Sequence, residues 1–176
     1  MATTITDDLL EQAYESLGIG ESTPSEKYGH VYSIRDEIYR IAKSKKFDIQ
    51  HSTTGAISER LCQLGLESAV PNTYFKMPQS WKWVGDYYVL GAPFNTIVSV
   101  KSYKARERLL VSGTGNLLSP TIGWGLLDSP KEFSVSRLES YKYRAFMAIY
   151  APQDKLLDHL SKEERAVTNI NGNPLI

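Results

Sequence analysis

Cysteine is almost absent from this 176-residue chain, in which Cys62 stands alone. A single thiol cannot form a disulfide within the chain, and it cannot supply a cysteine-rich zinc site. The histidines at positions 30, 51 and 159 are scattered, without carboxylates or cysteines at ligand spacing, so a histidine-metal site is not expected. Such low cysteine content is typical of a reducing compartment, and we expect a cytoplasmic protein.

The chain also lacks a charge excess and a long apolar run. Its 20 basic residues match 20 acidic ones, which argues against attraction of the whole surface to nucleic acid but leaves room for a local basic patch. No stretch approaches the ~20 apolar residues of a membrane-spanning helix, and the N-terminal segment has no signal-peptide pattern. With 41% hydrophobic residues, the composition predicts one folded domain, residues 1–176.

The first third of the chain carries helix patterns, with apolar residues at helical spacing. Thr6 precedes two aspartates and can cap a first helix that ends at Gly18. Ser33 resembles the start of a capping box, and this second helix should run to about Lys45. A third helix is predicted over residues 52–65.

From residue 81 onward the chain becomes rich in aromatic and β-branched residues, which favour strands. The strand segments are residues 81–91, 95–103 and 143–151, and a last helix should begin at Pro152. This order predicts an α/β protein with a mixed central β-sheet, flanked by helices, after a helical N-terminal third.

The first two predicted strands align an acid with a lysine. If residues 91–94 form the loop of a hairpin, Asp86 lies opposite Ser99, with Lys101 diagonal to it on the same face. One interpretation is a strand-end aspartate and a solvated edge lysine. The other places Lys101 at the border of a buried sheet, because apolar residues occupy both faces of its strand.

A carboxylate and a lysine at one end of a hairpin suit metal-dependent hydrolysis of phosphodiesters. Asp86 would hold Mg²⁺, and Lys101 would orient the attacking water or offset charge in the transition state. A second carboxylate should assist, and the candidates are Glu59 on the third predicted helix and Glu107 after the hairpin.

This arrangement resembles the PD-(D/E)XK nuclease core. The segment "SVKSYKARER" is similar to the Ser-x-Lys and Arg-Glu-Arg motifs of type II restriction endonucleases that cut GC-containing sites. The resemblance implies a restriction-endonuclease-like fold in which Ser99 replaces the usual acid, Lys101 is catalytic and the Arg-Glu-Arg triplet opens a base-reading helix. It also implies a homodimer that acts on a palindrome, and a cognate DNA methyltransferase as functional partner.

The Arg-Glu-Arg triplet also makes chemical sense for DNA recognition. Arg106 and Arg108 can bond guanine O6 and N7, while Glu107 can accept from cytosine N4. Ser102 and Lys104 would contact phosphates. The alternative interpretation is a solvated helix start with mixed charges.

The chain departs from the resembling branch at two places that bear on the metal. Gly85 stands where the family often has proline before the aspartate, and residues 111–116 lack the replacement carboxylate of that branch. Glu59 is then the better second ligand, although a plain surface glutamate is its other interpretation. We therefore expect a Mg²⁺-dependent double-stranded DNA endonuclease. The alternatives are a non-catalytic DNA-binding module with a degenerate nuclease site, and a structural or protein-interaction domain.

Overall fold

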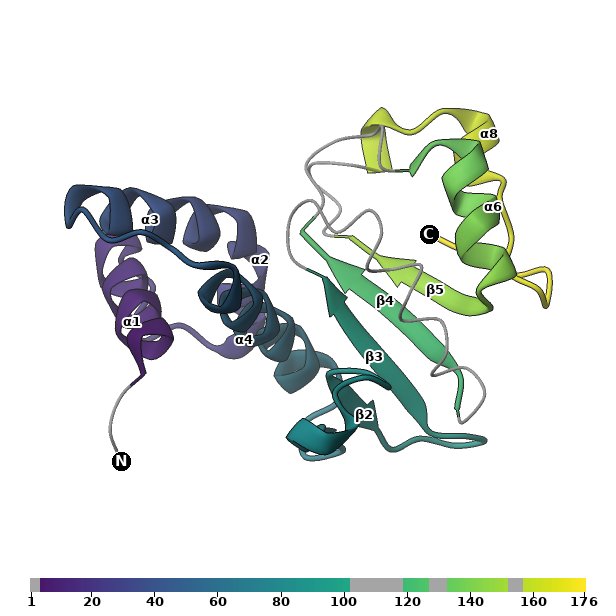
Figure 1. The fold of residues 1–176 in the computed structure, drawn as a ribbon, viewed down its shortest axis with the longest axis horizontal. Helices are drawn as coiled ribbons and strands as arrows, with labels where there is room; N and C mark the ends of the chain where they lie inside the picture. Colours follow the sequence, from purple (N-terminus) through teal and green to yellow (C-terminus); the bar gives the residue numbers. More distant parts are fainter. Residues whose placement is uncertain (1–3, 102–118, 127–132, 152–156) are drawn as a thin grey trace. The chain divides into compact units, whose positions relative to one another are not determined.

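The computed structural model describes residues 4–101, 119–126, 133–151 and 157–176 (Figure 1). The chain divides into two compact units, a helical unit at residues 1–71 and a sheet unit at residues 72–176. An α/β protein with a helical N-terminal region was predicted and is confirmed, whereas the single domain over residues 1–176 stays a prediction. Within the described ranges, no helix combines the length and the apolar character needed to cross a membrane.

The helical unit is built from amphipathic helices whose apolar residues are buried. Its helices are α1 (Ile5–Leu17), α2 (Pro24–Gly29), α3 (Val31–Ser44) and α4 (His51–Ala69). The least exposed core residues include Ala13, Ile34, Ile38 and Leu61. Because these side chains recur at helical spacing, α1, α3 and α4 each bury one apolar stripe.

The start of α1 differs from the prediction. Thr4, not Thr6, is the N-cap, and its hydroxyl oxygen accepts from the backbone N–H of Asp7 at 3.2 Å. Thr6 lies inside the helix and is buried. The end is as predicted, because Gly18 adopts a left-handed φ of 69°, a conformation that costs glycine little.

The other helix ends also differ from the sequence patterns. α2 was not predicted, although Thr23 and Glu26 form a capping box at its start. α3 begins after His30 without a side-chain cap, so the expected box at Ser33 is wrong. α4 does not end at Gly65 as predicted but continues to Ala69. The glycine serves close packing instead, because a Cβ there would overlap the ring of Tyr28.

The described strands of the sheet unit form one mixed five-stranded sheet. They are β1 (Tyr74–Lys76), β2 (Tyr87–Val89), β3 (Thr96–Lys101), β4 (Thr121–Gly125) and β5 (Phe146–Tyr150). The spatial order follows the chain, and β2, β3, β4 and β5 lie side by side in Figure 1. β2 is antiparallel to β1 and β3, whereas β4 is parallel to β3 and β5. The predicted mixed sheet is thus confirmed, and β1 and β4 lie outside the predicted strands.

The β2–β3 hairpin has the predicted register. Tyr87 pairs with Val98 and Tyr88 with Ile97, as a four-residue loop at 91–94 requires. Tyr87, Ile97 and Val98 are almost fully buried. The hairpin is therefore part of the core of the sheet unit, not a surface ribbon.

A second apolar cluster covers β5. The helix α6 (Val135–Tyr143) lies beside this strand in Figure 1. The buried members of the cluster are Phe133, Leu138, Tyr141, Phe146, Ile149, Leu160, Val167 and Leu175. The backbone N–H of Ile149 donates to the carbonyl of Leu175 at 2.6 Å, so the C-terminal segment also bonds to the outer strand.

The predicted last helix is wrong in its extent. Residues 152–156 lie outside the described residues. After them the chain forms a 3-10 turn, η4 (Leu157–His159), and a separate short helix, α8 (Lys162–Arg165). Ser161 and Glu164 form a capping box at the start of α8, so a new helix begins where one continuous helix was expected.

Candidate functional site

Asp86 lies directly before β2 and is bonded to β3 through both its backbone and its side chain. Its N–H donates to the carbonyl of Val98 at 2.9 Å, and its Oδ2 accepts from the N–H of Val100 at 2.7 Å. Its Oδ1 lies 3.9 Å from the Nζ of Lys82. The carboxylate is therefore held against the Ser99–Lys101 segment, and its side chain is only 14% exposed.

The local departure from the strand ladder explains this geometry. The sheet register pairs Val98 with Tyr87, yet the Val98 carbonyl accepts a hydrogen bond from the N–H of Asp86, the residue before Tyr87. Since the regular ladder ends here, the N–H of Val100 takes a side-chain carboxylate as its partner. A carboxylate that accepts a backbone N–H makes a charge-assisted hydrogen bond, stronger than one between neutral groups.

Gly85 is required by the same close approach. A Cβ at this position would overlap Cγ2 of Ile97 and lie 3.2 Å from the carbonyl oxygen of Val98. Proline also carries a Cβ, so the residue that the resembling family often has here would meet the same atoms. The glycine is thus explained by packing against β3.

Ser99 is buried with an unsatisfied hydroxyl. The residue is 1% exposed, and within the described part of the chain its Oγ has no hydrogen-bond partner. In the parallel β3–β4 ladder it pairs with Gly123, which offers no side chain. Leaving a buried polar group unpaired costs about 1–3 kcal/mol, so such an atom calls for an explanation.

Lys101 is the last residue of β3 and is partly buried. Strand alternation places it on the same face as Ser99 and Ile97. β2 runs antiparallel to β3, so Asp86, directly before β2, and Lys101, at the end of β3, lie at the same end of the hairpin. Three predicted site residues, Asp86, Ser99 and Lys101, thus lie at the same end of the β2–β3 hairpin.

The other predicted residues are not part of this group. Glu59 lies in α4 of the helical unit and is partly buried, so its role as a metal ligand stays a prediction. The predicted DNA contacts lie outside the described residues: Ser102, Lys104, Arg106, Glu107 and Arg108. Among the described residues, no group of three or more His, Cys, Asp or Glu side chains is placed to bind a metal ion.

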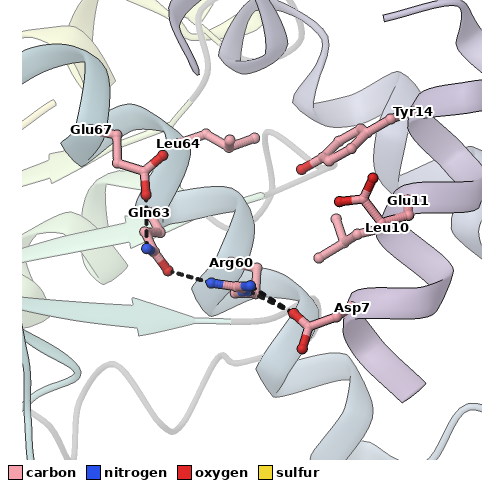
Figure 2. A pocket seen from close by; sticks show the side chains of 8 residues that line it. All are labelled: Asp7, Leu10, Glu11, Tyr14, Arg60, Gln63, Leu64 and Glu67. Carbon is pink, nitrogen blue, oxygen red and sulfur yellow. Dashed lines mark hydrogen bonds and ion pairs between the residues drawn. The ribbon is translucent and has the colours of Figure 1, made fainter. Parts of the chain in front are cut away.

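The helical unit contains a separate polar pocket between α1 and α4, with a volume of about 190 Å³ (Figure 2). Arg60 donates to Oδ1 of Asp7 at 2.7 Å and to the side chain of Gln63 at 3.0 Å. Gln63 in turn donates to Glu67 at 2.8 Å. The sequence analysis missed this pocket, because Asp7 and Arg60 are 53 residues apart and no local pattern connects them.

The electrostatics of the pocket follow from these contacts. The Thr4 hydroxyl, which donates to Asp7, and the Arg60 guanidinium hold the pKa of the Asp7 carboxyl below its usual range. Burial raises the pKa of Tyr14 to about 12, and the charges of Glu11 and Glu67 act in the same direction. Since the polar groups bond largely to one another, we assign the pocket to the packing of α1 on α4.

A comparison of the chain with protein-family models, with curated proteins and with solved structures found no match. The function is therefore inferred from the chemistry of Asp86, Ser99 and Lys101 at the end of the β2–β3 hairpin.

Proposed function

We propose that the chain is a Mg²⁺-dependent, site-specific endonuclease for double-stranded DNA, of the type II restriction kind. The observation that carries the proposal is the Val100 N–H···Asp86 hydrogen bond, because it holds a carboxylate against the Ser-Val-Lys end of β3. The mixed sheet with its antiparallel hairpin supports the restriction-endonuclease-like form of the PD-(D/E)XK core. A homodimer and a cognate methyltransferase are parts of the same proposal.

The oxygen atoms of Asp86 and Ser99, at this end of the β2–β3 hairpin, are of the kind that binds a hard cation. Mg²⁺ prefers oxygen ligands and is commonly held by one or two carboxylates together with waters and substrate phosphates. Asp86 offers a carboxylate, and the Ser99 Oγ is a buried oxygen without a partner among the described residues. Asp86 would hold the metal. When bound, the metal would polarise the phosphate and make water more acidic.

The remaining roles belong to side chains of the chain itself. Lys101 would orient the attacking water or offset negative charge as the phosphorus gains an oxygen ligand, because it is a partly buried cation at the end of β3. Arg106, Glu107 and Arg108 would read G·C pairs, and Ser102 and Lys104 would contact phosphates.

The test is cleavage of unmodified plasmid and phage DNA. We expect discrete bands with Mg²⁺ and none with EDTA. Lys101→Ala should lower the rate by about 10²–10³-fold, the usual loss when one group that stabilises transition-state charge is removed. Lys162→Ala, a change at an exposed lysine of α8, is the matched control and should cut normally. Full activity of the Lys101 variant would remove the catalytic assignment.

A second candidate function is supported by the bonds that Asp86 already makes. Its carboxylate accepts from Val100 and lies near Lys82, which is also the pattern of a purely structural aspartate. In that case the chain would be a DNA-binding module with a degenerate nuclease site. Duplex DNA that shifts in a gel yet stays intact with both Mg²⁺ and Mn²⁺ would establish this alternative.

A further inference from the structure

Two tryptophans of the sheet unit expose unusually large aromatic surfaces. Trp81 is 49% exposed and Trp83 is 64% exposed, whereas Trp124 on β4 is 6% exposed. The rings of the exposed pair are nearly parallel, with an interplanar angle of 19° and centroids 6.3 Å apart. Tryptophan is buried on average, and paired exposed rings are typical of binding surfaces.

The backbone holds this pair in place. The N–H of Met77 donates to the carbonyl of Asp86 at 2.9 Å and closes the connection between β1 and β2. Within it the 3-10 turn η1 (Gln79–Trp81) is followed by Val84, whose N–H donates to the Trp81 carbonyl and whose side chain is buried. The segment that carries the two rings is thus held by the Met77–Asp86 hydrogen bond and by the buried side chain of Val84.

The charges of this connection favour nucleic acid as the occupant. Residues 71–85 contain Lys76 and Lys82 and no acidic residue. Aromatic rings interleaved with lysine match the two parts of a nucleotide, because every base offers a π-face for stacking and every phosphate is negative. An apolar protein partner would account for the rings but not for the two lysines beside them.

The pair also lies close to the proposed site along the chain. Trp83 precedes Asp86 by three residues, which span at most about 11 Å of backbone. This upper limit is close to the rise of about three stacked nucleotides at roughly 3.4 Å each. Lys82, between the two tryptophans, has its Nζ 3.9 Å from the Asp86 carboxylate.

We propose that Trp81 and Trp83 form a stacking platform for an unpaired nucleobase of a DNA strand whose backbone passes Lys82 and Asp86. The inference rests on the proposed function, because it assumes that DNA is bound beside Asp86. It adds to that function an unpaired base close to the bond that is cut. The base can come from a single strand or from a duplex in which one base has left the stack, and both present the same aromatic face.

Tryptophan fluorescence of the full chain tests the platform, with EDTA present so that no DNA is cut. The probes are a 12-nucleotide oligothymidine, a fully paired 12-base-pair duplex and the same duplex with one bulged thymidine. We expect the single strand and the bulged duplex to quench the exposed tryptophans, while the buried Trp124 retains its emission. Trp83→Ala should weaken binding of these two probes by about 5- to 150-fold, the effect of losing one base–aromatic stack.

Two further variants separate stacking from general damage. Trp83→Phe should retain most of the affinity, because phenylalanine still offers a ring. Phe75→Ala removes an aromatic side chain of β1 that is 55% exposed and should leave binding unchanged. Retained circular dichroism and Trp124 emission would show that the Trp83 variant is folded.

The possible outcomes distinguish the platform from the nuclease. Loss of probe binding in Trp83→Ala supports the platform even if the wild type never cuts DNA, in which case the proposed endonuclease alone fails. Unchanged binding in Trp81→Ala and Trp83→Ala overturns the platform even in an active enzyme. Loss of self-association instead of DNA binding would assign the pair to a protein interface and also overturn it. Preference for the bulged duplex over the oligothymidine would identify a displaced base as the source.

Discussion

Replacing Asp86 by alanine should destabilise the sheet unit, independently of any catalytic role. The Asp86 carboxylate is the acceptor for the N–H of Val100, a residue that is 8% exposed. Alanine leaves this N–H without its acceptor. Removing one partner of a buried hydrogen bond costs about 1–3 kcal/mol, and bonds to charged groups lie toward the upper end.

The loss of the charge itself contributes less. The Lys82 ammonium lies 3.9 Å from Oδ1, and the lysine side chain is 28% exposed. Partly solvated pairs of this kind contribute about 0.2–1 kcal/mol. We therefore expect Asp86→Ala to lower the free energy of unfolding by about 2–3 kcal/mol in total.

Asp86→Asn separates the structural role from the catalytic one. Asparagine keeps a side-chain oxygen that can accept from Val100, so this variant should lose only about 1 kcal/mol. It removes the negative charge that would hold Mg²⁺, so cleavage should be abolished. Urea unfolding measures the stability of each variant. It is monitored by the fluorescence of Trp124 in a protein whose Trp81 and Trp83 are changed to phenylalanine. Amide hydrogen exchange at Val100 reports on the hydrogen bond itself.

The decisive result is the order of the variants. If Asp86→Ala is as stable as the wild type and the Val100 amide exchanges no faster, then the carboxylate does not hold β3. If Asp86→Asn is stable and also cuts DNA at the normal rate, the carboxylate has its structural role only. A stable, inactive Asp86→Asn beside a destabilised Asp86→Ala would establish both roles.

Two further predictions concern packing and titration. Gly85→Ala should destabilise the sheet unit by about 1–3 kcal/mol, because the new methyl overlaps buried Ile97; urea unfolding measures the loss, and an unchanged midpoint would contradict the packing explanation. Tyr14 has a pKa of about 12 in the folded protein against 10.0 for a solvent-exposed tyrosine, so its contribution to the free energy of unfolding is complete below pH 10 and is lost as pH rises through 12. Unfolding free energies from pH 9 to 12 should therefore fall less steeply for Tyr14→Phe, with exposed Tyr143→Phe as control; equal slopes would contradict the raised pKa.

The hairpin could be predicted because its register depends on local information. A four-residue loop and the alternation of side chains fix which residues face each other, and Tyr87 pairs with Val98 accordingly. The contact from Val100 to the Asp86 side chain could not be predicted in this way. It requires the backbone of Asp86 to bond one residue out of register, a departure that alternating residue types do not encode.

Short elements escaped the sequence patterns for a related reason. β1 has three residues, too few to show alternation, and its pairing with β2 is what makes it a strand. α2 has only six residues, but Thr23 and Glu26 at capping-box spacing were a usable signal that the sequence analysis did not take up. At α1 the same spacing rule favours Thr4, since Asp7 is the third residue after it.

The neutrality of the chain conceals a local positive charge around the candidate site. Between residues 68 and 106 the sequence has five basic residues, and Asp86 is its one acid. A DNA strand near Lys76, Lys82 and Lys101 would therefore meet attraction rather than repulsion, and the Asp86 carboxylate would be where a divalent cation can bridge protein and phosphate. If this distribution drives binding, affinity for duplex DNA should fall steeply as salt rises, because each phosphate contact releases counterions. A chain that binds through stacking alone would instead show little salt dependence, so the slope of affinity against salt measures how much of the recognition this basic segment provides.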